Sequence, residues 1–251
     1  MATFNVPTLR QLIRAGIQDL EIELDQELPI VGVERALNTA FSGALRDVYD
    51  YQTWIKNQII PSEQSADETI FDTARNEGVI RKAASYASGP VTFTGTKPLP
   101  LDTEMQTQDG VRFHVTATSD PSAGKITVTV QADETGLSGN LTAGDVLTLI
   151  SPVAGVNSDG VVADAGISGG ADVESVAELL TRLLYRKRNP PTGGALHDYV
   201  IWATELPGIS RAWAFDCWHG LGTVGLAWVY DQRTDIIPTG TDRESMQAYL
   251  F

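Results

Sequence analysis

Hydrophobic residues alternate with polar residues along three runs near the centre of the chain. Apolar side chains occupy every second position in residues 91–94, 111–115 and 126–130. A period of two places one face of a strand on a core and leaves the Thr, Arg and His side chains on the other face. Asp109 and Gly110 precede the second run and favour a tight hairpin, because glycine readily adopts positive φ. Residues 88–170 are therefore predicted to form a small antiparallel β module.

Before this module the apolar spacing becomes that of amphipathic helices. Thr8 and Gln11 have the spacing of a capping box, so the first helix is expected to begin there and to end by Pro29. A second helix is expected to stop before Pro61, because proline cannot continue a helix. Its apolar positions are Val33, Leu37, Phe41, Leu45, Val48, Ile55 and Ile59.

A third helix completes the predicted N-terminal region. Ser65 and Glu68 indicate a second capping box, and Gly78 is expected to close the helix. Burying one large apolar side chain contributes roughly 1.5–3 kcal/mol, so the apolar stripes of these helices are unfavourable in water. Two arrangements bury them equally well at this stage: an internal three-helix core, or an interface with a neighbouring subunit.

Helical and strand patterns are mixed after the β module. A helix is predicted over 172–188 and a shorter one over 196–206, followed by strands over 209–218 and 223–230. Residues 241–251 indicate the opening turns of one more helix, with no stop signal before the chain ends. We therefore expect the protein to continue beyond this point.

These patterns predict an α+β fold in three domains. The N-terminal helical region spans residues 1–83, the central antiparallel β domain spans 84–170, and a small α+β domain spans 171–251. The last domain is expected to be truncated at its C-terminal end.

Charge and composition exclude several classes of function. A formal net charge of −14 argues against general binding to nucleic acid or to an anionic membrane. Acidic residues crowd positions 19–34, and basic residues cluster at 182–188, so these two segments could pair between copies of the chain. Cys217 is the only cysteine, which excludes an intrachain disulfide and fits a reducing compartment. The N-terminus has no signal-peptide pattern, and no apolar stretch is long enough to span a bilayer.

Motifs with possible chemistry are better explained as structural features. Residues 220–225 match GxGxxG, but a nucleotide site needs a helix after the glycines and a strand is predicted there. His114, His197 and His219 lack metal-ligand spacing, and His114 is expected to be a solvated residue on the outer face of a strand. His197 and Asp198 could belong to a catalytic triad, but no nucleophile elbow accompanies them.

The remaining polar and aromatic candidates are also predicted to be structural. Four acidic residues near glycines lack the ligand spacing of a calcium loop and are expected to cap turns and helices. They are Asp159, Asp164, Asp172 and Glu174. Asn140 begins a glycosylation sequon by pattern only, and most of Trp202, Trp213, Trp218 and Trp228 are expected in a core. No catalytic, cofactor-binding or metal-ligating residue is predicted, so the function is expected to be associative and not enzymatic.

Three blocks of residues carry a resemblance to a known family. The first is FDTARNEGVIR at 71–81 with ASGPVTFTG at 87–95. The second is GN at 139–140, GVNS at 155–158 and ISGGADVE at 167–174. The third is RNPPTGG at 188–194, DY at 198–199, WA at 202–203, PGI at 207–209 and RAW at 211–213. In order and spacing these blocks resemble the baseplate J-like family of contractile phage tails, although the loop KPLPLD at 97–102 departs from its usual glycine pattern.

The resemblance implies a structural protein of the virion. Family members form part of the baseplate wedge around a six-fold axis, so the implied partners are other copies of the chain and other baseplate or tail proteins. The implied location is the tail baseplate of a phage or prophage particle, assembled in the bacterial host cytoplasm. No nucleic acid, membrane, cofactor or small-molecule substrate is expected. A glycan-binding or cell-wall-degrading tail module is the alternative function.

Overall fold

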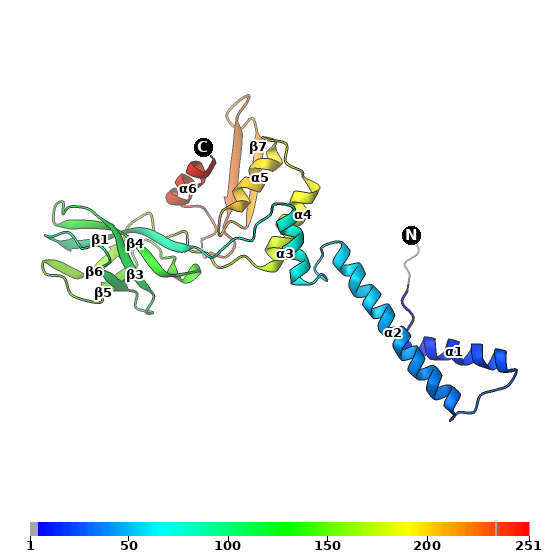
Figure 1. The fold of residues 1–251 in the computed structure, drawn as a ribbon. Coiled ribbons are helices and arrows are strands. Elements are labelled where there is room, and N and C mark those ends of the chain that lie inside the picture. The colour runs from blue at the N-terminus through cyan, green and yellow to red at the C-terminus, as the bar shows by residue number, and fades with distance from the viewer. Residues whose placement is uncertain (1–4, 234, 251) are drawn as a thin grey trace. The chain divides into compact units, whose positions relative to one another are not determined.

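The computed structural model describes residues 5–233 and 235–250. The chain divides into two compact units, Met1–Ile70 and Phe71–Phe251, and each is described by itself. Helices and antiparallel sheets both contribute, which confirms the predicted α+β class (Figure 1). The division into three domains at residues 83 and 170 stays a prediction.

The first unit contains a pair of helices, α1 (Leu9–Leu24) and α2 (Val33–Ile59). The predicted capping box at the start of α1 is confirmed: Gln11 N donates to Thr8 Oγ1 at 3.3 Å, and Thr8 N donates to Gln11 Oε1 at 2.8 Å. Asn38 Nδ2 of α2 donates to the Ile13 carbonyl of α1 at 2.9 Å, so a polar side chain joins the two helices. As predicted, α2 ends before the proline at position 61.

The apolar sides of α1 and α2 are not buried within the described chain. The only residue of these helices that is buried is Ser42. The apolar side chains of α2 that are at least half exposed are Val33, Leu37, Phe41, Val48, Tyr51, Trp54 and Ile59. The sequence left two arrangements open, an internal helical core and an interface with a neighbouring subunit. This helix pair does not form an internal core.

Helix α3 (Asp67–Asn76) begins differently from the prediction. The prediction of a capping box between Ser65 and Glu68 is wrong. Ser65 Oγ instead donates to the Asn57 carbonyl at 2.5 Å and accepts from Ser62 N at 2.9 Å. Those partners stabilise the turn before α3 instead. The predicted end is confirmed, since Gly78 adopts φ 72° and its N–H donates to the Arg75 carbonyl.

The second unit contains a closed antiparallel barrel with the strand order β1-β4-β3-β2-β5-β6 (Figure 1). Its strands are β1 (Tyr86–Gly95), β2 (Glu104–Gln106), β3 (Arg112–Thr118), β4 (Lys125–Thr135), β5 (Val146–Leu149) and β6 (Val156–Val162). A short 3-10 helix, η1 (Leu137–Gly139), follows β4. The three alternating runs of the sequence lie in or beside β1, β3 and β4, which confirms the predicted β module.

Alternating side chains of these strands fill the barrel. Phe93 and Phe113 are fully buried at its centre, and Leu99 of the loop after β1 is buried with them. Phe93 pairs with Gly160 of β6, where a Cβ atom would lie 2.4 Å from the Phe93 ring. The predicted hairpin before β3 is confirmed, because Gly110 has φ 85° and its N–H donates to the Thr107 carbonyl.

The rest of the second unit packs three helices with a two-stranded sheet. The elements are α4 (Val176–Arg188), α5 (Leu196–Glu205), β7 (Arg211–Asp216), β8 (Val224–Val229) and α6 (Gly240–Leu250). Residue 251, the last of the predicted helix, lies outside the described residues. The predicted start of α4 at position 172 is wrong, since Ser175 is the N-cap and forms a capping box with Glu178.

The tryptophans occupy more exposed places than predicted. Trp228 is buried with Ile209, Tyr230 and Met246, but Trp213 is 42% exposed and Trp218 is 61% exposed. The alternation of β7 explains Trp213, because Ala212 packs against the core and the adjacent side chain points to the other face. None of the helices in the described part of the chain is long and apolar enough to cross a membrane.

Candidate functional site

Two chain segments lie side by side where the chain enters and leaves the barrel. Ser85 and Ala171 form an antiparallel bridge, in which Ser85 N donates to the Ala171 carbonyl at 2.9 Å. Glu174 N donates to the Lys82 carbonyl at 3.1 Å, which continues the pairing toward α4. The barrel is therefore joined to the rest of its unit by a paired connector.

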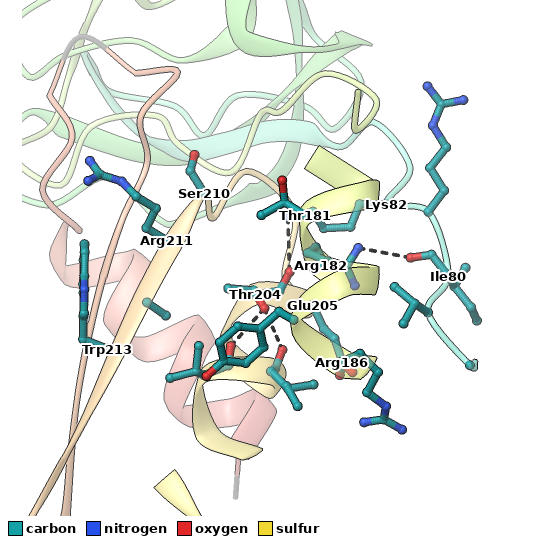
Figure 2. Close-up of a pocket in the computed structure, with 17 residues that line it drawn as sticks. Ile80, Lys82, Thr181, Arg182, Arg186, Thr204, Glu205, Ser210, Arg211 and Trp213 are labelled. Carbon is teal, nitrogen blue, oxygen red and sulfur yellow. Dashed lines mark hydrogen bonds between the residues drawn. The ribbon is translucent and has the colours of Figure 1, made fainter. Parts of the chain in front are cut away.

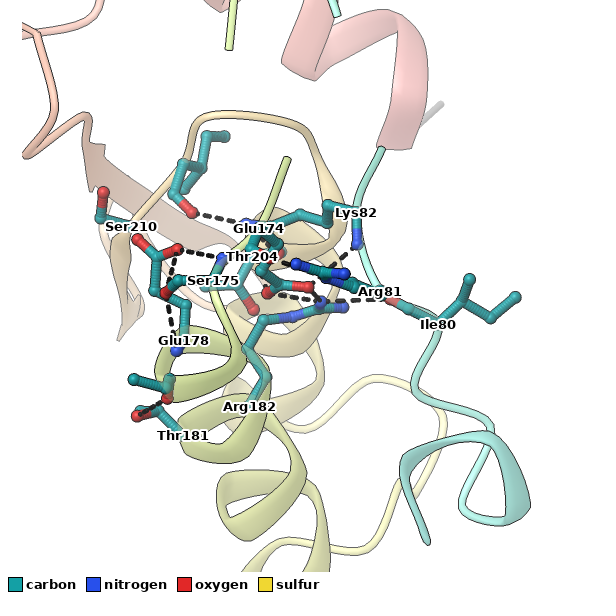
Figure 3. Close-up of polar contacts among 12 residues, drawn as sticks. Ile80, Arg81, Lys82, Glu174, Ser175, Glu178, Thr181, Arg182, Thr204 and Ser210 are labelled. Carbon is teal, nitrogen blue, oxygen red and sulfur yellow. Dashed lines mark hydrogen bonds and ion pairs between the residues drawn. The ribbon is translucent and has the colours of Figure 1, made fainter. Parts of the chain in front are cut away.

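A buried carboxylate stabilises this connector (Figure 3). The side chain of Glu174 is 0% exposed, and both of its oxygens lie 2.8 Å from Arg182 Nη1. Lys82 N donates to Glu174 Oε2 at 2.9 Å, and Lys82 Nζ lies 4.0 Å from Oε1. The prediction that Glu174 caps a turn or helix is thus wrong, since its one carboxylate is shared between Arg182, eight positions along the chain, and Lys82, 92 positions away.

Lys82 extends the ion cluster to α5 and to the segment before β7. Its Nζ donates to the Thr204 carbonyl at 3.2 Å and to the Ile209 carbonyl at 2.9 Å. Burial lowers the pKa of Lys82, and the nearby Glu174 carboxylate opposes that change. Sequence reasoning missed this residue; the only available signal was a pair of basic residues directly before the β module.

A cleft of about 540 Å³ lies beside the ion cluster, between residues 78–82, α4, α5 and β7 (Figure 2). Its charged lining comprises Arg81, Lys82, Arg182, Arg186 and Arg211 with one acid, Glu205. Its apolar lining comprises Val79, Ile80, Tyr185, Val200, Ile201, Ala212 and Trp213. The cleft thus combines positive charge with an apolar surface in a chain of net charge −14.

Three of the cleft cations are paired within the chain. Glu174 pairs with Lys82 and Arg182, and Asp231 pairs with Arg211. Among the described residues, no carboxylate pairs with Arg81 or Arg186. Arg81 is nevertheless held in place, because its Nε donates to the Glu174 carbonyl at 2.7 Å, but no carboxylate of the described chain neutralises the charge of either guanidinium group.

The turn before α5 is organised by Asp198. Its buried carboxylate accepts from Gly194 N at 2.7 Å, Ala195 N at 3.0 Å and Thr192 N at 3.2 Å. The Gly194 bond above all, with the other two amides, lowers the pKa of Asp198 to about 2, although burial opposes the shift. This carboxylate therefore caps the turn before α5, and His197 Nε2 lies 3.5 Å from its Oδ1.

The other polar candidates also have structural partners. His114 is not simply solvated as predicted, because its Nδ1 lies 2.6 Å from Asp133 Oδ1. Asp159 accepts from Thr148 Oγ1 at 2.9 Å, and Asp172 accepts from Leu137 N at 3.2 Å. Within residues 5–233 and 235–250, no group of three His, Cys, Asp or Glu side chains is placed to hold a metal ion.

The glycine motif and the basic cluster complete the set of candidates. Residues 220–225 lie in the hairpin between β7 and β8, so a strand follows the glycines and the structural interpretation is confirmed. In the basic cluster, Arg182 pairs with Glu174 and Lys187 Nζ pairs with Glu77 at 2.9 Å. Arg186 and Arg188 are the members without a carboxylate partner among the described residues.

Two family models match the second unit. The model described as Baseplate J-like protein barrel domain matches residues 90–170, and the one described as Baseplate J-like central domain matches residues 191–251. The first match covers the closed barrel almost entirely. A solved baseplate of the anti-feeding prophage aligns with a TM-score of 0.44 and 14% identity, over 94% of this chain and 68% of that chain.

Relatives match the chain over nearly its whole length. Baseplate protein gp47 of Escherichia phage Mu is 40% identical over 252 aligned positions, which cover 98% of this chain and 69% of the relative. Mu-like prophage FluMu protein gp47 of Haemophilus influenzae is 39% identical with the same coverage. This similarity includes the helix pair of the first unit as well as the barrel and the cleft. The chain belongs to the Baseplate J-like family of baseplate proteins.

Proposed function

We propose that the chain is a non-catalytic structural component of the baseplate wedge of a contractile phage or prophage tail. It acts by contacts with other copies of itself and with other baseplate proteins. It is assembled in the bacterial host cytoplasm and becomes part of the virion. The family membership supports the baseplate role, and the exposed apolar face of α2 supports the mode of action.

The observation that carries the proposal is a regular apolar seam along α2. Its members follow one another at alternating spacings of four and three, and they are Leu37, Phe41, Ala44, Val48, Tyr51 and Ile55. That spacing gives a period of 3.5 residues, which is the pattern by which helices pack around each other in coiled coils. We therefore infer that the α2 seam, as we call these six residues, packs against a helix of a neighbouring molecule.

The exposure of the α2 seam makes this packing favourable. Phe41 is 76% exposed and Leu37 is 65% exposed, and both lie beside Leu20 of α1 along an apolar groove. Helix α2 has 27 residues, which corresponds to a length of about 40 Å. The seam runs from Leu37 to Ile55, or about 28 Å of this helix. It offers enough apolar surface for a specific helix interface, because each large side chain that is buried contributes roughly 1.5–3 kcal/mol.

Incorporation into tails tests the proposal. The chain with Phe41→Ser and Val48→Ser would replace the native protein in a cell that produces the particle. Electron microscopy should then show tails without complete baseplates, whereas a variant with Asp47→Ser, which leaves the α2 seam intact, should support normal tails. Complete baseplates in both variants would contradict the proposed role of the seam.

The non-catalytic part of the proposal has its own test. The hydrolase alternative requires an acid and a base placed for glycoside cleavage. Among the described residues that line the cleft, the only carboxylate is that of Glu205, which accepts from Tyr249 Oη at 2.6 Å. Purified peptidoglycan mixed with the full chain should keep its turbidity, and clearing of the suspension would show an enzymatic activity.

A further inference from the structure

The loop between α1 and α2, residues 25–32, presents two aliphatic side chains to water. Ile30 is 88% exposed and Val31 is 89% exposed, whereas the neighbouring Leu28 is buried. We call these eight residues the tip loop. Its two outward side chains contribute nothing to the packing of their own unit, so their exposure requires another explanation.

The tip loop is held in one conformation by bonds on its inner side. Arg35 Nε donates to the Pro29 carbonyl at 2.6 Å, and Arg35 Nη2 donates to the Leu28 carbonyl at 3.0 Å. Glu21 Oε1 accepts from Leu28 N at 3.1 Å. A loop fixed in this way loses little conformational entropy when a partner covers its exposed residues, which favours binding.

Acidic residues precede and follow the two aliphatic residues in the chain. Asp25 and Glu27 belong to the tip loop and are exposed, and Glu23 and Glu34 flank it on the two helices. Among the described residues, none of these four acids forms an ion pair within the chain. The loop therefore presents an exposed apolar pair together with four acids that have no ion-pair partner in the part of the chain that the structure describes.

The cleft beside the ion cluster has the complementary character. Arg81 and Arg186 lack carboxylate partners there, and Ile80 and Trp213 add exposed apolar surface. Its volume of about 540 Å³ lies in the range of cavities that enclose small ligands, so it can accept the side chains of a short loop. The cleft is therefore complementary to the tip loop in charge and also in apolar surface.

We propose that the tip loop of one copy docks in the cleft of a second copy, with Ile30 and Val31 against the apolar lining and the four acids facing Arg81 and Arg186. The inference rests on the proposed assembly through contacts between copies, but it uses a surface other than the α2 seam. Such a contact joins different faces of the two molecules. It therefore leaves a free loop at one end and a free cleft at the other, which can close into a ring.

Complementation between two variants tests this contact. All chains carry Phe41→Ser and Val48→Ser, so the α2 seam does not contribute. The loop variant adds Ile30→Ser and Val31→Ser, and the cleft variant adds Arg186→Glu. A tagged loop variant should retain an untagged cleft variant on an affinity resin, because that pair keeps one intact loop and one intact cleft. Retention should fall at least about ten-fold when both partners are loop variants or both are cleft variants.

Matched controls separate this contact from loss of folding and from the seam. Leu221→Ser removes an aliphatic residue that is 96% exposed on another loop, and Arg188→Glu reverses a charge on α4 outside the cleft. Both should leave retention unchanged. Ile80→Ser serves as a second cleft variant if Arg186→Glu alters the circular dichroism melt, because Ile80 lines the cleft and is 78% exposed. Equal retention in every pair, or retention in none, would overturn the docking. The proposed role of the seam is tested separately, by restoring Phe41 and Val48 in these variants and measuring retention again.

Discussion

Both carboxylate oxygens of Glu174 lie 2.8 Å from Arg182 Nη1 at the junction between the barrel and α4. The substitution Glu174→Gln removes the negative charge and leaves Arg182 and Lys82 nearly buried without a counterion. Removing one member of a buried ion pair costs roughly 3–5 kcal/mol, so we expect a loss of that size in the free energy of unfolding. Urea denaturation followed by circular dichroism measures it.

The matched control for that substitution is Glu77→Gln. Glu77 pairs with Lys187 on the surface, where the two side chains are 41% and 38% exposed. Exposed pairs contribute about 0–1 kcal/mol, so this variant should unfold almost as the wild type does. Equal losses in the two variants would show that Glu174 does not stabilise the junction in the way its contacts indicate.

Gly160 and Phe93 give a second prediction. A Cβ atom at position 160 would lie 2.4 Å from the ring of Phe93, which is fully buried in the barrel. Gly160→Ala should therefore destabilise the protein by roughly 1–3 kcal/mol, because overpacking forces neighbouring groups to shift. In a double-mutant cycle with Phe93→Leu, the cost of the alanine should be smaller. If Gly160→Ala destabilises the Phe93→Leu variant as much as the wild type, the steric clash does not involve the Phe93 ring.

Asp198 predicts a dependence of stability on pH. The Gly194, Ala195 and Thr192 amides lower its pKa from 3.8 to about 2, so the unfolded state binds the proton more readily. The stabilisation by the carboxylate is therefore fully present above about pH 4 and is lost as the pH falls toward 2. The melting temperature of the wild type should exceed that of Asp198→Asn at pH 7. The difference should shrink between pH 4 and pH 2, and a difference independent of pH would contradict the assignment.

Cys217 predicts a slow reaction with alkylating agents. The hydrogen bond to Asp216 raises the pKa of this exposed thiol, so little reactive thiolate forms near neutral pH. Asp216→Asn should accelerate alkylation by iodoacetamide at pH 8, as measured by mass spectrometry. The two rates should converge at a pH where both thiols are ionised. Identical rates at pH 8 would show that Asp216 has no influence on the thiol.

Features that depend on neighbouring residues in the sequence could be predicted. Thr8 and Gln11 lie three positions apart, so their capping box needed no tertiary information. The period of two likewise located the strands whose side chains, such as Phe113, fill the barrel. Ser65 shows the limit of this reasoning, because its hydroxyl bonds the Asn57 carbonyl, a tertiary partner that spacing does not reveal.

Features that depend on long-range contacts could not be predicted. Closure of the barrel requires β1 to pair with β6, and alternation within β1 does not indicate its partner. Glu174 was predicted to be a capping residue from its local sequence alone. Its backbone partner, Lys82 N, lies 92 positions away, and nothing in the sequence indicates that contact. The cleft was missed for the same reason, since Arg81, Arg186 and Trp213 come together only in the folded unit.

Light scattering of the full chain across a concentration series tests the central claim, that this protein works by packing exposed surfaces against its neighbours. The wild type should show a mass that rises with concentration to a multiple of 27.1 kDa, whereas the variant with Phe41→Ser and Val48→Ser should associate much less. A constant mass of 27.1 kDa for the wild type at every concentration would contradict the account.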